Sequence, residues 1–391
     1  MRSNARDIIL MIIIPIFAIS CSTPDEPTAQ ADPGPAFQAL VDSVVAEDDG
    51  IHGVALAVVS PTMGIEWEGA AGLADPEAGT PMTPANPVRI ASNTKTYVAA
   101  TVLRLAEGGK IDLDTAIGHY LDPELSELLE TDGYDPSAIT IRHLLTHTGG
   151  LNDHGGAEEY TAAIVANPNH HWTPHEQIRC LVDWCEPLAG PGEVYSYSDS
   201  GYVLLGTIIE NITGQGLAEA VREQVGFGKL GLNATWWEIL EPAPEGATER
   251  AHQFLGDLDV TGFLPYFDLY GGGGIATTMG DLARFHGAIF RGEVYSNPGT
   301  VDIMLSTIEG AAVSPTANER SLPPGAYRMG VWVLETEGYA TYHHTGFWGT
   351  MAVHVPELDL TLAATGNQNQ MGPGFDEILV EVIRIVGTEA Q

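Results

Sequence analysis

Strand-like segments lie near both ends of the chain, and this placement restricts the fold more than any other feature. Near the N-terminus, residues 53–60 (GVALAVVS) and 64–72 (GIEWEGAAG) have strand-like composition and are joined by a short turn. Turns such as EGY and PELD join further strand-like segments near the C-terminus, which span 328–336, 340–346, 349–355 and 359–367. Short turns indicate antiparallel neighbours. The simplest topology is one sheet completed by both ends of the chain.

An amphipathic helix accompanies the strands at each end. The inner face of the first carries Phe37, Leu40, Val41, Val44 and Val45, and that of the last carries Phe375, Ile378, Leu379, Val382 and Ile383. The middle of the chain is helical or irregular. We predict an α/β (α+β) fold: an antiparallel sheet flanked by the terminal helices, with a mostly helical subdomain inserted and a cleft between the two parts. The α/β part would span about 37–90 and 300–391, and the helical part about 91–299.

The first residues have the layout of an export signal. Arg2 and Arg6 precede an apolar run, 8–19, that is too short to span a bilayer, and small residues precede Cys21. A cysteine at this place resembles the bacterial lipobox, in which it is lipidated, although Ala18 stands where leucine is commoner. We predict a lipoprotein signal peptide over 1–20, a flexible tether over 21–36 and a catalytic domain over 37–391. The protein would be exported to the periplasmic side of a bacterial membrane; ordinary cleavage would instead leave a soluble periplasmic or secreted protein.

The charge of the chain restricts its partners. The 52 acidic residues outnumber the 16 lysines and arginines, which gives a formal net charge of −36. Such a surface repels nucleic acid and anionic membrane surfaces. We therefore expect neither as a partner, and membrane contact only through the N-terminal lipid anchor.

Two cysteines remain beyond the signal, Cys180 and Cys185. Export permits a disulfide between them. Within one regular helix their Cα atoms would lie ~8 Å apart, too far for a bond, so a disulfide requires the helix to end between them. A disulfide and two free thiols both remain open.

Ser92 and Lys95 form the first candidate site. The chain has three lysines, and Lys95 follows Ser92 by three residues at the start of an apolar helical segment. Positions i and i+3 share a helix face, so the two side chains can touch, and the helix start can stabilise a developing anion. The alternative is an exposed lysine beside a capping serine, because the S-x-x-K pattern alone is weak.

Two later motifs strengthen this interpretation. Tyr197, Ser198 and Asp199 precede an apolar helix, and His344, Thr345 and Gly346 end a predicted strand. The three motifs, in this order, resemble those of the serine hydrolases that include class C β-lactamases, D-alanyl-D-alanine carboxypeptidases and related esterases. Residues 139–151 and 271–285 are also similar to that family. The resemblance implies a β-lactamase/transpeptidase-like fold.

The resemblance also implies roles for single residues. Ser92 would be the nucleophile that forms an acyl-enzyme, and Tyr197 would take its proton, as a phenolate or through a proton shuttle. Lys95 would support Tyr197 and orient Ser92. The backbone N–H groups of Ser92 and Phe347 would form the oxyanion hole. The substrate site would be lined by Asp199, His344, Thr345 and Gly346, with His344 and Thr345 at the acyl or carboxylate end.

Two departures from the family pattern affect the substrate. Asp199 stands where asparagine is usual, and a carboxylate can only accept hydrogen bonds. It could pair with Lys95, shift the preference away from amides, or mark a degraded site. His344 stands where many members have lysine, and a neutral histidine lacks the fixed charge that attracts a carboxylate.

Other chemistries have less support. His143 and His147 have the spacing of a zinc helix, but Leu144 stands where a metalloprotease has glutamate, so we expect no metal and no cofactor. No G-x-S-x-G occurs. The first interpretation is a D-alanyl-D-alanine carboxypeptidase-like peptidase acting on peptidoglycan peptides or a related small molecule. An esterase on small acyl esters and a β-lactamase are the enzymatic alternatives. A cell-wall-binding lipoprotein that keeps the fold without catalysis is the other.

Overall fold

The computed structural model describes residues 32–263, 270–313, 326–369 and 373–389. Pro33–Gln391 form one compact unit. The predicted signal peptide (1–20) and Cys21 lie outside the described residues. Helix α1 (Gly34–Glu47) begins inside the range predicted as a tether, because Pro35 suits the first helical turn. Among the described residues no helix has both the length and the apolar character needed to cross a membrane.

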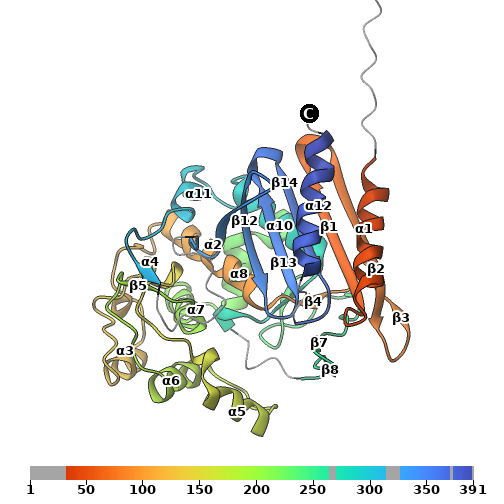
Figure 1. Cartoon of the computed structure of the whole chain (residues 1–391). Coiled ribbons are helices and arrows are strands. Elements are labelled where there is room, and N and C mark those ends of the chain that lie inside the picture. The colour runs from red at the N-terminus through yellow and green to blue at the C-terminus, as the bar shows by residue number, and fades with distance from the viewer. Residues whose placement is uncertain (1–31, 264–269, 314–325, 370–372, 390–391) are drawn as a thin grey trace, which may run out of the picture. The chain divides into compact units, whose positions relative to one another are not determined.

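A large antiparallel sheet forms the central layer (Figure 1), with strand order β11-β12-β13-β14-β1-β2-β3. Strand β1 pairs with β14 from Ala55 opposite Thr365 to Val59 opposite Thr361. The two ends of the chain therefore complete one sheet, and the predicted fold is confirmed. The strand bounds are β1 (Gly53–Ser60), β2 (Ile65–Asp75), β3 (Thr80–Pro81), β11 (Trp332–Thr336), β12 (Tyr339–Gly346), β13 (Thr350–Val355) and β14 (Leu360–Thr365).

Two of the C-terminal strands are shorter than predicted by more than one residue. Strand β11 begins at Trp332 rather than at Arg328, because Arg328 N–H closes a tight turn on the Val331 carbonyl at 2.7 Å. Strand β14 is bounded by Asp359 and Asn367, which both have a φ of 43° and therefore leave the extended conformation.

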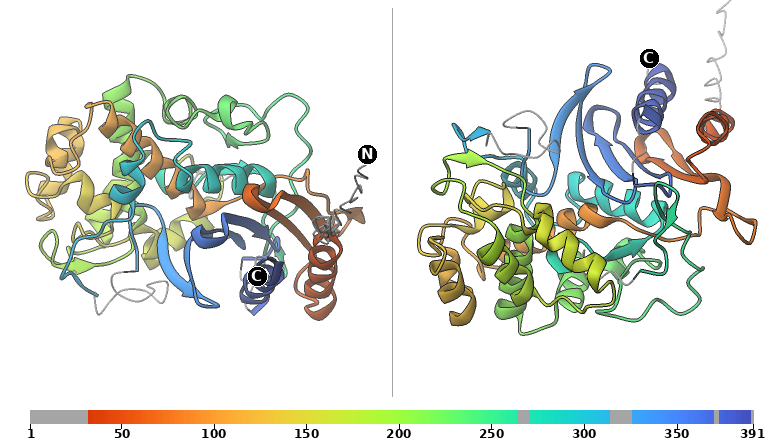
Figure 2. Two further views of the ribbon diagram at one scale, coloured as in Figure 1. Left: turned by 90° about the horizontal axis from the view of Figure 1, so that it is seen from above. Right: turned by 60° about the horizontal axis from the view of Figure 1, so that its bottom comes forward.

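Side-chain size differs between the two faces of the sheet. In β1, Val54, Leu56 and Val58 join the cluster packed by α1 and α12 (Pro373–Glu389), whereas Ala55 and Ala57 belong to the opposite core. Helix α10 (Met279–Phe290) packs on this alanine face, and Figure 2 shows it on the other side of the sheet from α1 and α12. Small side chains on the strands let the helix approach closely.

The rest of the unit is mostly helical. Helix α10 falls in the range assigned to this part but packs on the sheet, so the helical part and the sheet are joined through it. The remaining helices are α2 (Thr94–Glu107), α3 (Pro123–Glu130), α4 (Ile141–Leu145), α5 (Glu158–Ala166), α6 (Pro174–Trp184), α7 (Asp199–Thr213), α8 (Leu217–Val225), α9 (Phe227–Leu230) and α11 (Gly299–Met304). Short strands are β4 (Val88–Arg89), β5 (Val194–Tyr195), β6 (Trp236–Trp237), β7 (Phe254–Leu255), β8 (Leu258–Asp259), β9 (Ile275–Thr277) and β10 (Ala312–Val313).

Helix α2 links the two parts. It is buried along most of its length and packs against α7 and α8. The 3-10 turn before it, η2 (Ala91–Asn93), packs against β12 and β13. Ser92 therefore lies where the sheet meets the helical part.

Candidate active site

A strained turn presents Ser92. Strand β4 pairs with β9 and leads into Ala91, whose φ is 43°. A left-handed conformation costs a non-glycine residue about 1–2 kcal/mol, so the surrounding contacts must hold it. Ser92 follows in η2, half-buried, and the chain continues directly into α2.

Lys95 is buried completely and its ammonium group is saturated with acceptors. Its Nζ lies 3.1 Å from Ser92 Oγ and 2.8 Å from the Gly272 carbonyl oxygen, and it forms an ion pair with Asp199. An ammonium group has three protons, and these acceptors together with the Tyr197 oxygen surround them. The expected contact between Lys95 and Ser92 is thus present.

The charge of Lys95 is fixed by its neighbours. Burial alone would lower its pKa, but the Asp199 carboxylate and, next, Tyr197 raise the pKa of Lys95 well above its ordinary range. Lys95 is therefore a permanent cation at neutral pH. It can stabilise negative charge on Ser92, but it cannot accept the Ser92 proton.

The loop before α7 brings Tyr197 to the same place. Ser198 caps α7, its hydroxyl donates to the Asn152 carbonyl at 2.6 Å, and its N–H donates to His147 Nδ1 at 3.2 Å. The Tyr197 ring stacks on Trp332 with centroids 5.8 Å apart, and it lies with its centroid 5.0 Å from Lys95 Nζ. The Tyr197 ring is therefore held between the sheet and the helical part.

Tyr197 is a neutral phenol in this environment. Burial raises its pKa to about 12; Lys95 and hydrogen bonds with Ser92 and Lys95 act in the opposite direction, whereas Asp199 raises the pKa further. The Asp199 charge offsets the ammonium that would otherwise favour a phenolate. A neutral phenol is suited to a proton shuttle, one of the two expected roles for Tyr197, and that role stays a prediction.

Asp199 is half-buried at the start of α7, and its carboxylate forms an ion pair with Lys95. Its backbone N–H donates to Asp153 Oδ1 at 3.0 Å. Burial, and next the Asp199 charge, raise the pKa of Asp153 to about 7. Two carboxyl groups thus lie beside one ammonium, which agrees with the expected Lys95–Asp199 pair.

His344 faces inward. Its ring is completely buried, and burial, followed by the Lys95 charge, holds its pKa well below the usual range. Nδ1 lies 2.8 Å from the Thr345 carbonyl oxygen, which can only accept, so Nδ1 carries the proton. Nε2 can then accept from the Tyr327 hydroxyl at 3.3 Å. Both ring nitrogens of His344 thus have partners within the protein, and its expected contact with a substrate stays a prediction.

The turn after β12 lies against the nucleophile segment. A Cβ on Gly346 would stand 2.1 Å from the Ile90 carbonyl oxygen, so only glycine fits there. Thr350 Oγ1 donates to the same carbonyl at 3.1 Å, and Asn93 Nδ2 donates to Thr350 Oγ1 at 3.0 Å. The turn that carries Phe347 is therefore fastened beside Ser92, as an oxyanion hole would require. Thr345 and Phe347 are exposed at this edge.

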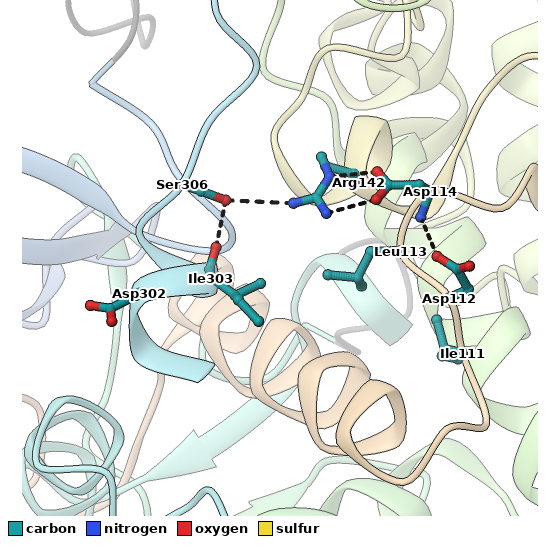
Figure 3. A pocket seen from close by; sticks show the side chains of 8 residues that line it. All are labelled: Ile111, Asp112, Leu113, Asp114, Arg142, Asp302, Ile303 and Ser306. Carbon is teal, nitrogen blue, oxygen red and sulfur yellow. Dashed lines mark hydrogen bonds and ion pairs between the residues drawn. The ribbon is translucent and has the colours of Figure 1, made fainter. Parts of the chain in front are cut away.

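A separate surface hollow of about 570 Å³ lies away from these residues. Figure 3 shows Arg142 directed at both oxygens of Asp114, with N–O distances of 2.7 and 3.0 Å. Its lining contains none of the predicted site residues. In the part of the chain that the structure describes, no group of three or more histidine, cysteine or carboxylate side chains is placed to bind a metal ion.

The disulfide alternative is wrong. Cys180 and Cys185 are free thiols. Helix α6 continues to Trp184, so it does not end early enough to bring the two sulfur atoms together.

Several site residues escaped the sequence interpretation. Gly272 supplies a carbonyl to Lys95, and the glycine run 271–274 was a usable signal for close backbone approach. Asp153, Tyr327 and Trp332 carry no local pattern that marks them. Their roles depend on contacts between distant segments.

Comparison with known proteins identifies the family of the chain. The Beta-lactamase family model matches residues 37–383. Esterase EstB of Burkholderia gladioli is 38% identical over 173 residues, which is 43% of this chain and 43% of that protein. A putative D-alanyl-D-alanine carboxypeptidase of Escherichia coli (strain K12) is 26% identical over 308 residues, 71% of this chain and 68% of that protein.

A solved structure supports the fold. The D-amino acid amidase from Ochrobactrum anthropi SV3 matches with a TM-score of 0.74 at 24% identity, over 92% of this chain and 100% of that chain. Identity at this level carries the fold alone, whereas the family model covers most of the sequence. The chain therefore belongs to the Beta-lactamase family, whose members are serine hydrolases of the β-lactamase and penicillin-binding protein type.

Proposed function

We propose that the chain is a serine hydrolase that forms an acyl-enzyme on Ser92 and prefers uncharged esters. The observation that carries the proposal is that a serine hydroxyl, an ammonium group and a phenol lie in contact. Lys95 Nζ lies 3.1 Å from Ser92 Oγ, and the Tyr197 phenol forms hydrogen bonds with both side chains.

A phenol can serve this reaction without becoming a phenolate. As Ser92 Oγ bonds to the acyl carbon, its proton passes to the Tyr197 oxygen, and the Tyr197 proton passes to the leaving oxygen as its bond breaks. In deacylation, water attacks the acyl carbon and passes a proton to the Tyr197 oxygen. Tyr197 returns its own proton to Ser92 Oγ as the bond between Oγ and the acyl carbon breaks. Lys95 stabilises the negative charge that develops on both oxygens.

The substrate preference follows from two residues. A substrate ending in a carboxylate calls for a fixed cation, and His344 is neutral and buried. An amide N–H donor is not available from the Asp199 side chain, which accepts from Lys95. These two features favour neutral esters over peptides ending in D-alanine.

A D-alanyl-D-alanine carboxypeptidase-like peptidase is the second candidate. The resemblance to the putative carboxypeptidase over 71% of this chain favours it. Both candidates share the acylation of Ser92 and differ in the leaving group. A β-lactamase would need the same acylation and fast hydrolysis of the ring-opened acyl group. We also propose export as a lipoprotein acylated at Cys21, which mass spectrometry of the mature N-terminus would test.

Covalent labelling and three substrates test the proposal together. We expect a fluorophosphonate to label the wild-type chain and not Ser92→Ala, and to label Tyr197→Phe about a hundredfold more slowly, because the proton relay is lost. We expect p-nitrophenyl acetate to be hydrolysed faster than a D-Ala-D-Ala peptide or nitrocefin. Faster peptide cleavage would select the second candidate. An unlabelled wild-type chain would favour a non-catalytic binding protein.

A further inference from the structure

We propose that Gln253 is a positioning residue that holds together the two segments supplying the oxyanion donors, and this inference rests on the proposed function. The expected donors are the backbone N–H groups of Ser92 and Phe347. They belong to segments more than 250 positions apart in the chain. One buried amide side chain contacts the neighbours of both.

Gln253 is 1% exposed, and its amide uses both ends. Oε1 accepts from Arg89 N–H at 2.8 Å. Nε2 donates to the Arg89 carbonyl at 3.0 Å and to the Trp348 carbonyl at 3.3 Å. Arg89 lies three residues before Ser92, and Trp348 directly follows Phe347. The amide therefore bridges the two segments.

The bridge takes the place of a missing strand. Strand β4 pairs with β9 on one edge, where Ile90 N–H also donates to the Ile275 carbonyl at 3.0 Å. The Arg89 N–H and carbonyl point to the other edge, and the Gln253 amide satisfies both, as a neighbouring peptide group would. The nucleophile segment is thus held from both sides.

Apolar packing acts on the same two segments. Ala91, Val260 and Trp348 form a small buried cluster. Val260 N–H donates to the Gln253 carbonyl at 3.0 Å, so the residue that bridges the segments also fixes the apolar contact. The strained φ of Ala91 needs such support to persist. Gln253 therefore acts together with Thr350 and Asn93 to hold Ser92 in position relative to the turn that carries Phe347.

The expected consequence is kinetic. Oxyanion donors act only when they lie close to hydrogen-bond distance from the developing charge, and a displacement near 1 Å can cost about a hundredfold. Loosening the bridge should lower kcat and leave substrate affinity nearly unchanged, because the oxyanion forms only in the transition state.

The test uses Gln253→Glu and a matched control. Glutamate has the same shape, but it cannot donate and sets a carboxylate against the Arg89 and Trp348 carbonyls. Gln368→Glu is the control, because Gln368 also donates to two carbonyls, of Gly50 at 3.2 Å and Gly256 at 3.0 Å, and touches neither catalytic segment. Gln253→Met, which adds no charge, serves if Gln253→Glu does not fold.

We expect Gln253→Glu to lower kcat on p-nitrophenyl acetate by about tenfold to a hundredfold with KM changed less than about threefold, and Gln368→Glu to change neither. Affinity for phenylboronic acid, whose tetrahedral adduct needs the oxyanion donors, should fall in parallel with kcat. Equal kinetics in the two variants, or a kcat loss without weaker boronate binding, would overturn the inference alone. A wild-type chain that neither labels nor turns over would overturn the proposed function and this inference together.

Discussion

At the scale of single residues, Asp199 acts, after burial, on the protonation of its neighbours. Its carboxylate pairs with Lys95 and so removes much of the positive field that would otherwise make Tyr197 acidic. Asparagine, usual at this position in the family, would leave that field uncompensated. The Asp199 charge thus acts in the same direction as burial, which is the larger cause that keeps Tyr197 a phenol.

We expect Asp199→Asn to lower the pKa of Tyr197 from about 12 by about one unit or more, because Asp199 raises it and Lys95 lowers it. In a pH titration, the phenolate absorbance of the Asp199→Asn variant is compared with that of the double variant that also carries Tyr197→Phe. The difference between the two titrations is the signal of Tyr197. The same difference in the wild-type background is the reference. Superimposable titrations in the two backgrounds would show that Asp199 does not set the protonation of Tyr197.

Sequence reasoning succeeded where spacing along a helix fixed the geometry. Ser92 and Lys95 touch because positions three apart share a helix face. Tyr197 could be named through its motif, but spacing along the chain does not bring a residue 102 positions beyond Lys95 to its side chain. The burial of His344 was out of reach, because it depends on rings from other segments, Trp332 and Tyr327.

At the scale of elements, helix α7 packs closely against the 3-10 turn η6 (Tyr270–Gly272), and this packing forms the site that holds the Lys95 side chain. A Cβ on Gly271 would lie 1.8 Å from the Tyr202 carbonyl oxygen. The neighbouring Gly272 carbonyl accepts from Lys95. The backbone of η6 can reach the site only because glycine allows this approach.

We expect Gly271→Ala to lower the free energy of unfolding by about 3 kcal/mol or more, because backbone atoms of α7 cannot yield to the new methyl group. Gly262→Ala is the control, since nothing lies within 4 Å of a Cβ there. Urea denaturation of both variants measures the difference. A Gly271→Ala chain as stable as Gly262→Ala would mean that η6 and α7 do not pack this closely.

Most element positions followed from pattern. The predicted strand 53–60 coincides with β1 (Gly53–Ser60), because an apolar run bounded by turn residues marks a buried strand. The start of β11 and the end of β14 did not follow from the pattern, because a tight turn at Arg328 and the positive φ of Asn367 interrupt segments whose composition looks strand-like. Local turn geometry is the weaker signal in a sequence.

At the scale of the whole molecule, the excess of acidic residues is the main feature that affects stability. The formal net charge is −36, and few cations oppose it. Mutual repulsion of surface carboxylates opposes the compact state, and salt screens it. Ion pairs such as Arg384 with Glu337 are exposed and contribute little against this repulsion.

We expect the Tm to rise by several degrees between about 0.01 and 1 M NaCl, as the Debye length falls from about 30 Å to about 3 Å. KCl at equal ionic strength should act alike, because screening does not depend on the cation. Sorbitol at equal osmolality, which does not screen charge, separates this effect from solvent exclusion. A Tm that stays flat or falls with salt would show that repulsion does not limit the stability of this chain.

The sequence by itself determined the antiparallel sheet, the terminal helices and the Ser92–Lys95 pair, because periodicity and helix spacing are local and survive without the rest of the fold. Only the tertiary structure decided that Tyr197 rests as a phenol, that His344 is sealed and neutral, and that Gln253 bridges two distant segments. Protonation and positioning depend on burial and on charges from other parts of the chain, and no local pattern encodes these.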